Sequence, residues 1–323
     1  MSDREEKTGK NDNGKKNKGG KRNKIVAIEM IILVLLIMAA VAIFIQRDKS
    51  VKEAAKIHNQ KAKKTEQTPQ VAQKENEIEE ETEGTEEENG DRDASVPDRS
   101  NFAVQPGVSV GTTEQSDEKI VYLTLDDGPS DNTQAVLDIL DKYNAKATFF
   151  VTGEMPEYKD MIKAAYDKGH TIGMHTYSHD YAKVYASVDA YFQDLDQIGQ
   201  MVQEEIGYVP CFIRFPGGSS NTVSKKYTAG IMSTLVQEVQ NRGYQYYDWN
   251  GSSGDGSVRT TEELVAQATS FDSNNIILLC HDSHGKQTTV EALPQIIEHY
   301  QSLGYTFKAL DRDSFVAHHG VNN

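Results

Sequence analysis

The segment 124–129 reads Thr-Leu-Asp-Asp-Gly-Pro and places two adjacent carboxylates, Asp126 and Asp127, where an apolar run ends. The run 120–125 is typical of a buried strand, and the Gly-Pro pair is a turn signal. Two like charges this close oppose each other's ionisation unless a cation compensates them. The pair therefore predicts a metal ion or an arginine beside it.

A second pattern is the pair His175 and His179, the first and last residues of His-Thr-Tyr-Ser-His. On a helical turn this spacing brings both imidazoles to one face, within reach of one metal ion. One aspartate and two histidines leave a coordination position for water, whose pKa zinc lowers to ~7. Cobalt, nickel and manganese also suit this ligand set. We therefore expect a divalent metal site, with zinc as the first choice.

The scaffold for these residues is predicted from about residue 117 onward. Short apolar runs alternate there with segments of helical period, a pattern typical of consecutive βα units around a parallel sheet or barrel. The fold class is therefore α/β. Seven strands are expected, at residues 120–125, 146–151, 170–175, 211–214, 244–249, 276–280 and 305–310.

Residues with chemical potential recur at the ends of these predicted strands. In a barrel of parallel strands the carboxyl ends meet on one face, where catalytic groups from distant parts of the chain converge. The residues at or just beyond those ends are Asp126, Asp127, His175, Arg214, Trp249 and His281.

At these residues the chain resembles the polysaccharide deacetylases of carbohydrate esterase family four. The resemblance covers about residues 117–318 and implies a distorted (β/α)7 barrel. It rests on five short motifs in the family's order: Thr124–Pro129, His175–His179, Arg214–Pro216, Trp249 with Asp255, and Leu279–His281.

The resemblance implies that Asp127, His175 and His179 hold the metal ion. It also implies that Asp126 is the general base that takes a proton from the attacking water. Arg214 suits the task of orienting Asp126 and keeping it ionised, because a guanidinium offers paired donors and does not lose its charge.

The acid that protonates the leaving amine would be His281, by the same resemblance, with the aspartate of the fourth motif tuning its pKa. We align Asp255 with that aspartate. Asp248, directly before Trp249, is the alternative.

The substrate groove departs from the family pattern. Many members have an aromatic residue after the third-motif proline, whereas this chain has Gly217, so Phe215 or Tyr177 is expected to replace that wall. A backbone N–H in the loop 216–218 is expected to help stabilise the oxyanion. The predicted contacts of substrate or oxyanion are Tyr177, Phe215, Pro216, Gly217, Trp249 and Leu279.

Composition divides the 323 residues, with a net charge of -15, into segments of different character. Residues 1–24 are a basic tail, and residues 25–45 form an apolar run long enough for a bilayer span of ~20 residues. The basic flank should remain cytoplasmic. We expect a single-pass membrane anchor with an extracellular catalytic domain; a cleaved signal peptide and a secreted enzyme are the alternative.

The segment 46–116 is polar and then acidic, and it is expected to be a disordered linker. The catalytic domain is predicted over 117–318, and residues 319–323 are expected to be a tail, with His318 and His319 read as part of it. His284 is expected to be a loop residue because the metal set is complete without it. His170 is placed at the end of the barrel opposite the site.

The two cysteines, Cys211 and Cys280, both fall within predicted strands. Free buried thiols are expected, with a single disulfide as the alternative for a domain that faces outward.

These expectations combine into a metal-dependent deacetylase of a cell-surface polysaccharide, with the N-acetylglucosamine of peptidoglycan as the leading substrate. The topology argues for it, since an anchor and a linker would present the domain to the wall layer. Two alternatives stay open: an O-acetyl esterase acting on xylan or another glycan, and a non-catalytic wall-binding module. No nucleic-acid or protein partner is implied.

Overall fold

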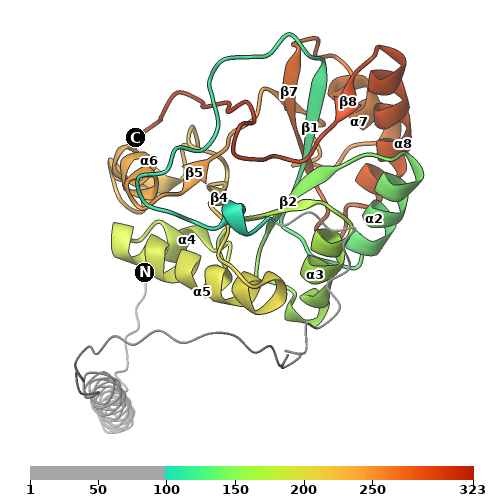
Figure 1. Cartoon of the computed structure of the whole chain (residues 1–323). Helices are drawn as coiled ribbons and strands as arrows, with labels where there is room; N and C mark the ends of the chain where they lie inside the picture. Colours follow the sequence, from blue (N-terminus) through green and yellow to red (C-terminus); the bar gives the residue numbers. More distant parts are fainter. Residues whose placement is uncertain (1–98) are drawn as a thin grey trace, which may run out of the picture. The chain divides into compact units, whose positions relative to one another are not determined.

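A parallel sheet centred on β1 (Ile120–Asp126) organises residues 99–323, the part of the chain that the computed structural model describes (Figure 1). The strands follow the order β5-β4-β3-β2-β1-β7-β6, and β8 also pairs with β1. The other strands are β2 (Ala147–Val151), β3 (Thr171–Met174), β4 (Phe212–Ile213), β5 (Gln245–Tyr246), β6 (Gly251–Ser252), β7 (Asn275–His281) and β8 (Thr306–Phe307).

All seven predicted strands are present, and every pairing between strands is parallel. The strand β6 was not predicted, because Gly251 and Ser252 have low strand propensity and pair only through contact with β7. The fifth predicted strand is shorter than expected. It ends at Tyr246, after which the backbone N–H of Asp248 bonds to the carbonyl of Ala317.

The strands form a half-barrel rather than a closed ring, since within residues 99–323 no ladder joins β5 to β6. The N-terminal and C-terminal segments fill the open side, where the N–H of Val316 bonds to the carbonyl of Thr112 at 2.8 Å. The predicted parallel α/β class is confirmed, and the open side accounts for the distortion of the barrel.

The sheet is covered by residues that precede the domain boundary expected at 117. The ring of Phe102 meets that of Phe212 edge-on at 5.2 Å, and the carbonyl of Phe102 accepts the N–H of Cys211 at 2.8 Å. Residues 99–112 therefore pack on the sheet, and their apolar residues Phe102, Val104 and Val110 join the interior cluster.

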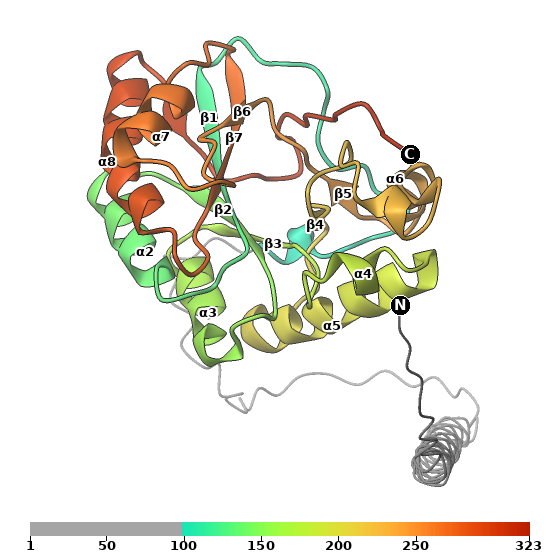
Figure 2. The ribbon, with the colours of Figure 1, turned by 180° about the vertical axis from the view of Figure 1, so that it is seen from behind.

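Helices cover the outer face of the sheet, and the C-terminus lies close to α6 (Figures 1 and 2). They are α2 (Thr133–Lys142), α3 (Asp160–Asp167), α4 (Tyr181–Val184), α5 (Val188–Ile206), α6 (Ile231–Asn241), α7 (Thr261–Ala268) and α8 (Gln287–Ser302), with short 3-10 turns at η1 (Ser100–Phe102), η2 (Pro156–Tyr158) and η3 (Ser224–Lys226).

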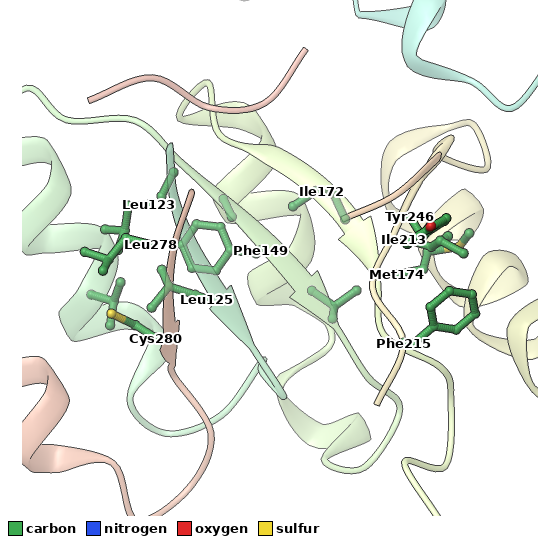
Figure 3. Packing of buried hydrophobic residues seen from close by; sticks show 14 of the residues in the cluster. Leu123, Leu125, Phe149, Ile172, Met174, Ile213, Phe215, Tyr246, Leu278 and Cys280 are labelled. Carbon is green, nitrogen blue, oxygen red and sulfur yellow. The ribbon is translucent and has the colours of Figure 1, made fainter. Parts of the chain in front are cut away.

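Alternate residues of β1, β2, β4 and β7 enter two different apolar clusters. Leu123 and Leu125 pack with Leu278 and Cys280 under the helices (Figure 3), while Tyr122 belongs to the cluster inside the half-barrel. This follows from the two-residue period of a strand. Even-numbered positions of β1, including Asp126, thus face the interior.

Both cysteines are free and buried, as expected. Cys280 lies in the cluster under the helices and Cys211 in the interior cluster, so the two thiols are in different parts of the core. Burial raises the pKa of Cys211 to about 11 and raises that of Cys280 as well. Neither thiol is reactive at neutral pH.

Among residues 99–323, no helix has the length and apolarity needed to cross a bilayer. The predicted basic tail 1–24, the predicted span 25–45 and most of the predicted linker lie outside the described residues.

Candidate active site

Three predicted ligands lie together just beyond the ends of β1 and β3. Asp127 Oδ1 is 3.4 Å from His175 Nε2 and 3.3 Å from His179 Nε2. The ligand atoms of all three residues lie within 4.8 Å of one another. Asp127 Oδ1 is buried and, among the described residues, has no hydrogen-bond partner. A buried, unpaired carboxylate oxygen between two imidazoles fits a cation.

The protonation of this cluster also fits a cation. Burial lowers the pKa of His175, and the ring is therefore neutral at pH 7, the form that binds metals. His175 Nδ1 lies 2.8 Å from the carbonyl oxygen of Arg214, which leaves Nε2 facing Asp127. Burial opposes the ionisation of Asp127, but the neighbouring histidines outweigh it and lower its pKa.

The backbone is strained at this cluster. Asp127, Thr176 and His179 have φ values of 66°, 71° and 46°, in the left-handed region that non-glycine residues seldom occupy. Each such residue costs on the order of 1 kcal/mol or more, so the surrounding contacts must impose the conformation.

Asp194 on α5 supplies one of those contacts, and the sequence reasoning did not identify it. Its Oδ1 accepts the backbone N–H groups of Tyr177 and Ser178, and its Oδ2 accepts the hydroxyl of Ser178 at 2.6 Å. The sequence did contain a signal for this buried carboxylate, because Asp194 lies three residues after Tyr191 and four before Ile198, on the apolar face of its helix. A carboxylate there needs buried donors.

Arg214 and Asp126 form a buried ion pair inside the half-barrel, with Nη1 2.7 Å from Oδ1. The expected paired donation to Asp126 is not found. Nη1 also donates to Thr124 Oγ1, while Nε and Nη2 donate to the carbonyls of Tyr247 and Asp248. The guanidinium thus links β1, β4 and the chain after β5, and it orients Asp126 through a single N–H on Nη1.

Asp255 contacts His281, whereas Asp248 does not. Asp255 Oδ1 is 2.8 Å from His281 Nδ1, and its Oδ2 accepts the backbone N–H of His281 and the hydroxyl of Thr289. His281 Nε2 then points toward the metal cluster, 3.9 Å from Asp127 Oδ2. Burial opposes the charged imidazole, but Asp255 and the other two carboxylates raise the pKa of His281 to about 9.

Asp248 instead joins two loops. It accepts the N–H and hydroxyl of Ser219 and the backbone N–H of His319. His319 Nε2 is 2.6 Å from the carbonyl oxygen of Trp249, and the ring of His318 stacks on Tyr246 at 3.9 Å. The prediction of a tail here was wrong, because long-range partners hold both histidines.

Some of the predicted substrate residues are free to contact a substrate, and others are packed in the core. Trp249 is half-buried near Arg214, and Leu279 faces the interior on β7 two residues before His281. Phe215 is 1% exposed and packs against Tyr191 and Tyr246, so the prediction that it replaces the missing wall was wrong.

Tyr177 is also a poor replacement. Its ring packs over Gly153, where a Cβ would come within 2.3 Å of it.

The loop 216–218 offers one free donor. The N–H of Gly218 bonds to the carbonyl of Phe215, and that of Ser219 bonds to Asp248. Among the described residues the N–H of Gly217 has no acceptor, so it is the remaining donor for an oxyanion. Pro216 contributes its carbonyl, which accepts the hydroxyl of Tyr185.

Asp282 is a second residue that the sequence reasoning missed. It is fully buried, accepts the hydroxyl of Thr133 at 2.6 Å and bonds through its own carbonyl to Ser130. Burial raises its pKa to about 7. It holds the turn after Asp127 against β7. His284, by contrast, is an exposed loop residue paired with Asp131, as expected.

Comparison with known proteins gives concordant matches. A sequence profile described as polysaccharide deacetylase matches residues 113–236. A peptidoglycan-N-acetylglucosamine deacetylase of Bacillus cereus is 29% identical over 226 residues, covering 65% of this chain and 78% of that protein. A bifunctional xylanase/deacetylase of Pseudobutyrivibrio xylanivorans is 32% identical over 207 residues, covering 62% of this chain and 31% of that protein.

Solved structures agree. The catalytic domain of peptidoglycan N-acetylglucosamine deacetylase from Eubacterium rectale is 47% identical, with a TM-score of 0.63, and the match covers 65% of this chain and 97% of that domain.

Proposed function

Because the chain belongs to the polysaccharide deacetylase family, we propose that it is a metal-dependent hydrolase that removes N-acetyl groups from a cell-surface polysaccharide. The N-acetylglucosamine of peptidoglycan is the proposed substrate. One observation carries the proposal: the Asp126–Arg214 and Asp255–His281 pairs flank the cluster of Asp127, His175 and His179. Base, acid and candidate metal ligands are then all within one site.

The division of labour follows from the contacts. Asp126 Oδ1 is occupied by Arg214, while Oδ2 faces the metal cluster, 3.8 Å from His175 Nε2. Oδ2 is therefore the atom that accepts a proton from the attacking water. A divalent cation held by Asp127, His175 and His179, proposed to be zinc with cobalt, nickel or manganese as alternatives, would lower the pKa of that water and polarise the acetyl carbonyl.

The leaving group requires a proton, because an amine anion is a very poor leaving group. His281 holds one at neutral pH and directs Nε2 into the site, since Asp255 occupies Nδ1. As the C–N bond of the amide breaks, His281 transfers that proton to the nitrogen. A cation on Asp127 would offset part of the negative field and move the pKa of His281 toward neutrality.

The acetyl group needs an apolar pocket and a donor for its oxygen. Leu279 and Trp249 flank the half-barrel interior near His281 and Arg214, and they suit the methyl group. The N–H of Gly217 suits the developing oxyanion.

The proposed setting of the enzyme comes from the sequence. Residues 25–45 are proposed to anchor the chain in the cell membrane, with 46–98 as the tether and the catalytic domain outside. The proposal is supported by the length of the apolar run and its basic flank.

An O-acetyl esterase acting on xylan or another glycan is the second candidate, favoured by the similarity to a bifunctional xylanase/deacetylase. The experiment that separates the two uses the full-length protein loaded with zinc. Acetate release is measured from peptidoglycan, N-acetylglucosamine oligomers and acetylated xylan, with chelated enzyme as the control. Release from xylan alone would replace the N-deacetylase proposal with the esterase, and no release from any glycan would favour the binding module.

A further inference from the structure

The space above Gly217 is taken by the side chain of another element. Gly217 has φ +75°, and a Cβ built on it would come within 2.7 Å of the Tyr181 hydroxyl and 3.1 Å of Asn221 Cβ. The third-motif loop therefore lacks its own side chain at this point because Tyr181 already occupies the room. Glycine meets both the backbone and the packing requirement.

Tyr181 is held firmly at the edge of the metal cluster. It begins α4, where Asp180 caps the helix by accepting the N–H of Ala182 at 2.9 Å. Its ring meets His179 edge-on at 5.7 Å and Tyr185 at 5.6 Å. The hydroxyl of Tyr185 in turn bonds to the carbonyl of Pro216, so the ring of Tyr181 bridges the cluster and the loop of Gly217.

The hydroxyl of Tyr181 makes no hydrogen bond within residues 99–323, and the side chain is only half-buried. A fixed aromatic ring with a free, accessible hydroxyl beside a catalytic cluster suits recognition of a sugar. The other aromatic residues considered for this wall, Phe215 and Tyr177, are packed elsewhere.

We propose that Tyr181 is a specificity-determining residue of the proposed deacetylase: its ring forms the groove wall beside Gly217, and its hydroxyl donates a hydrogen bond to the 2-acetamido sugar being deacetylated. This inference rests on the proposed function. In many family members the side chain after the third-motif proline forms this wall. Here Gly217 stands at that position, and we assign the contact to Tyr181, which follows the second motif.

The first test compares Tyr181→Phe and Tyr181→Ala with the unmodified full-length protein. Loss of one hydrogen bond to the sugar should raise KM for an N-acetylglucosamine tetramer ~5–10-fold in Tyr181→Phe, and loss of the ring should raise it further in Tyr181→Ala. Hydrolysis of a small aryl acetate, which does not reach the groove wall, should fall several-fold less. Tyr143→Phe is the matched control, because its hydroxyl bonds to Glu298 at the far end of α2.

A second measurement does not depend on turnover. In the Asp126→Asn background, calorimetric titration with the tetramer should show ~5–10-fold weaker binding when Tyr181 is also changed to Phe. The melting temperature and zinc stoichiometry should match those of Asp126→Asn alone. Equal affinity with and without the hydroxyl would overturn the inference while leaving the proposed function intact. If no glycan released acetate, the proposed function would fall, but this titration would still test Tyr181. If the tetramer did not bind at all, the inference about Tyr181 would be overturned.

The coupling between Tyr181 and Gly217 gives a third test. Gly217→Ala places a methyl group against the Tyr181 hydroxyl, so it should lower tetramer affinity more in the presence of Tyr181 than in Tyr181→Phe. Additive effects of the two changes would show that the two positions do not share the groove wall.

Discussion

His170 and His281 occupy opposite ends of the parallel sheet, and their pKa values are shifted in opposite directions. His170, just before β3, is fully buried; its Nδ1 accepts the N–H of Ala147 at 3.2 Å. Burial, together with nearby Lys146, lowers its pKa to about 3. His281, at the end of β7, lies against Asp255 and has its pKa raised to about 9. At the amino end a neutral imidazole is buried as part of the packing. At the carboxyl end, carboxylates surround His281 and keep its imidazole protonated for chemistry.

The carboxyl end also holds most of the backbone strain. Among residues 99–323, three of the four non-glycine residues with positive φ, Asp127, Thr176 and His179, lie there, and the fourth, Asn144, lies before β2. In the same part of the chain, Asp127 Oδ1 has no hydrogen-bond partner. We expect substitutions at the carboxyl end to affect the chemistry and substitutions at the amino end to affect stability alone.

The largest effect is expected for Asp126→Asn, which keeps the shape of the side chain and removes the base. Turnover of N-acetylated glycan should fall by ~10²–10⁴ or more, measured as acetate release. Asp131→Asn is the control, since within residues 99–323 Asp131 forms an ion pair only with the exposed His284. Activity retained within tenfold in Asp126→Asn would assign the base to another residue.

His281→Ala should come next, with a loss that depends on the leaving group. Amide cleavage should fall ~10²–10³-fold, because the amine needs a proton, while cleavage of an aryl acetate should fall far less. The ratio of the two rates is the measurement. An equal loss on both substrates would mean that His281 serves the structure of the site rather than the leaving group.

Asp255→Asn should move the pH profile. The pKa of His281 is raised, so the acid is protonated below that pKa and is lost as pH rises through it. Without the charge of Asp255 the pKa falls, and the basic limb of kcat/KM should shift ~1–2 pH units toward acid. Asp248→Asn should leave this limb in place, since Asp248 contacts Ser219 and His319 instead. The opposite pattern would exchange the two aspartates.

The smallest effect is expected at the amino end. The lowered pKa of His170 means that only the unfolded chain takes up this proton between pH 6.5 and about 3, so acid destabilises the fold through this residue. Between pH 6.5 and 5.0 that linkage amounts to about 2 kcal/mol, and His170→Gln should remove it from urea unfolding curves. Deacetylation at pH 7 should stay within a few-fold. An unchanged pH dependence would show that His170 is protonated in the fold.

Local pattern was sufficient for much of the site. The apolar run before Asp126 and Asp127, the three-residue gap between His175 and His179, and the strand ending at His281 are properties of short segments. The helical turn expected to bring the two histidines together was wrong, because the segment 175–179 is not helical and both Thr176 and His179 have positive φ. Parallel strands bring such ends to one face regardless of how far apart they are in the chain. The alternation along β1 and β4 also directs Asp126 and Arg214 into the same interior.

The remaining features depended on distances that no local pattern contains. Asp255 and Asp248 both lie within six residues of Trp249 in the chain, and only the fold places one of them against His281. Tyr181 and Gly217 lie 36 positions apart and share one space, and residues 99–112 cover the open side of the half-barrel through contacts with segments far away in the chain. The sequence alone determined which residue types stand at the strand ends, because backbone periodicity sets this locally. The tertiary structure decided which of those residues touch, because contacts between distant segments depend on how the whole core packs.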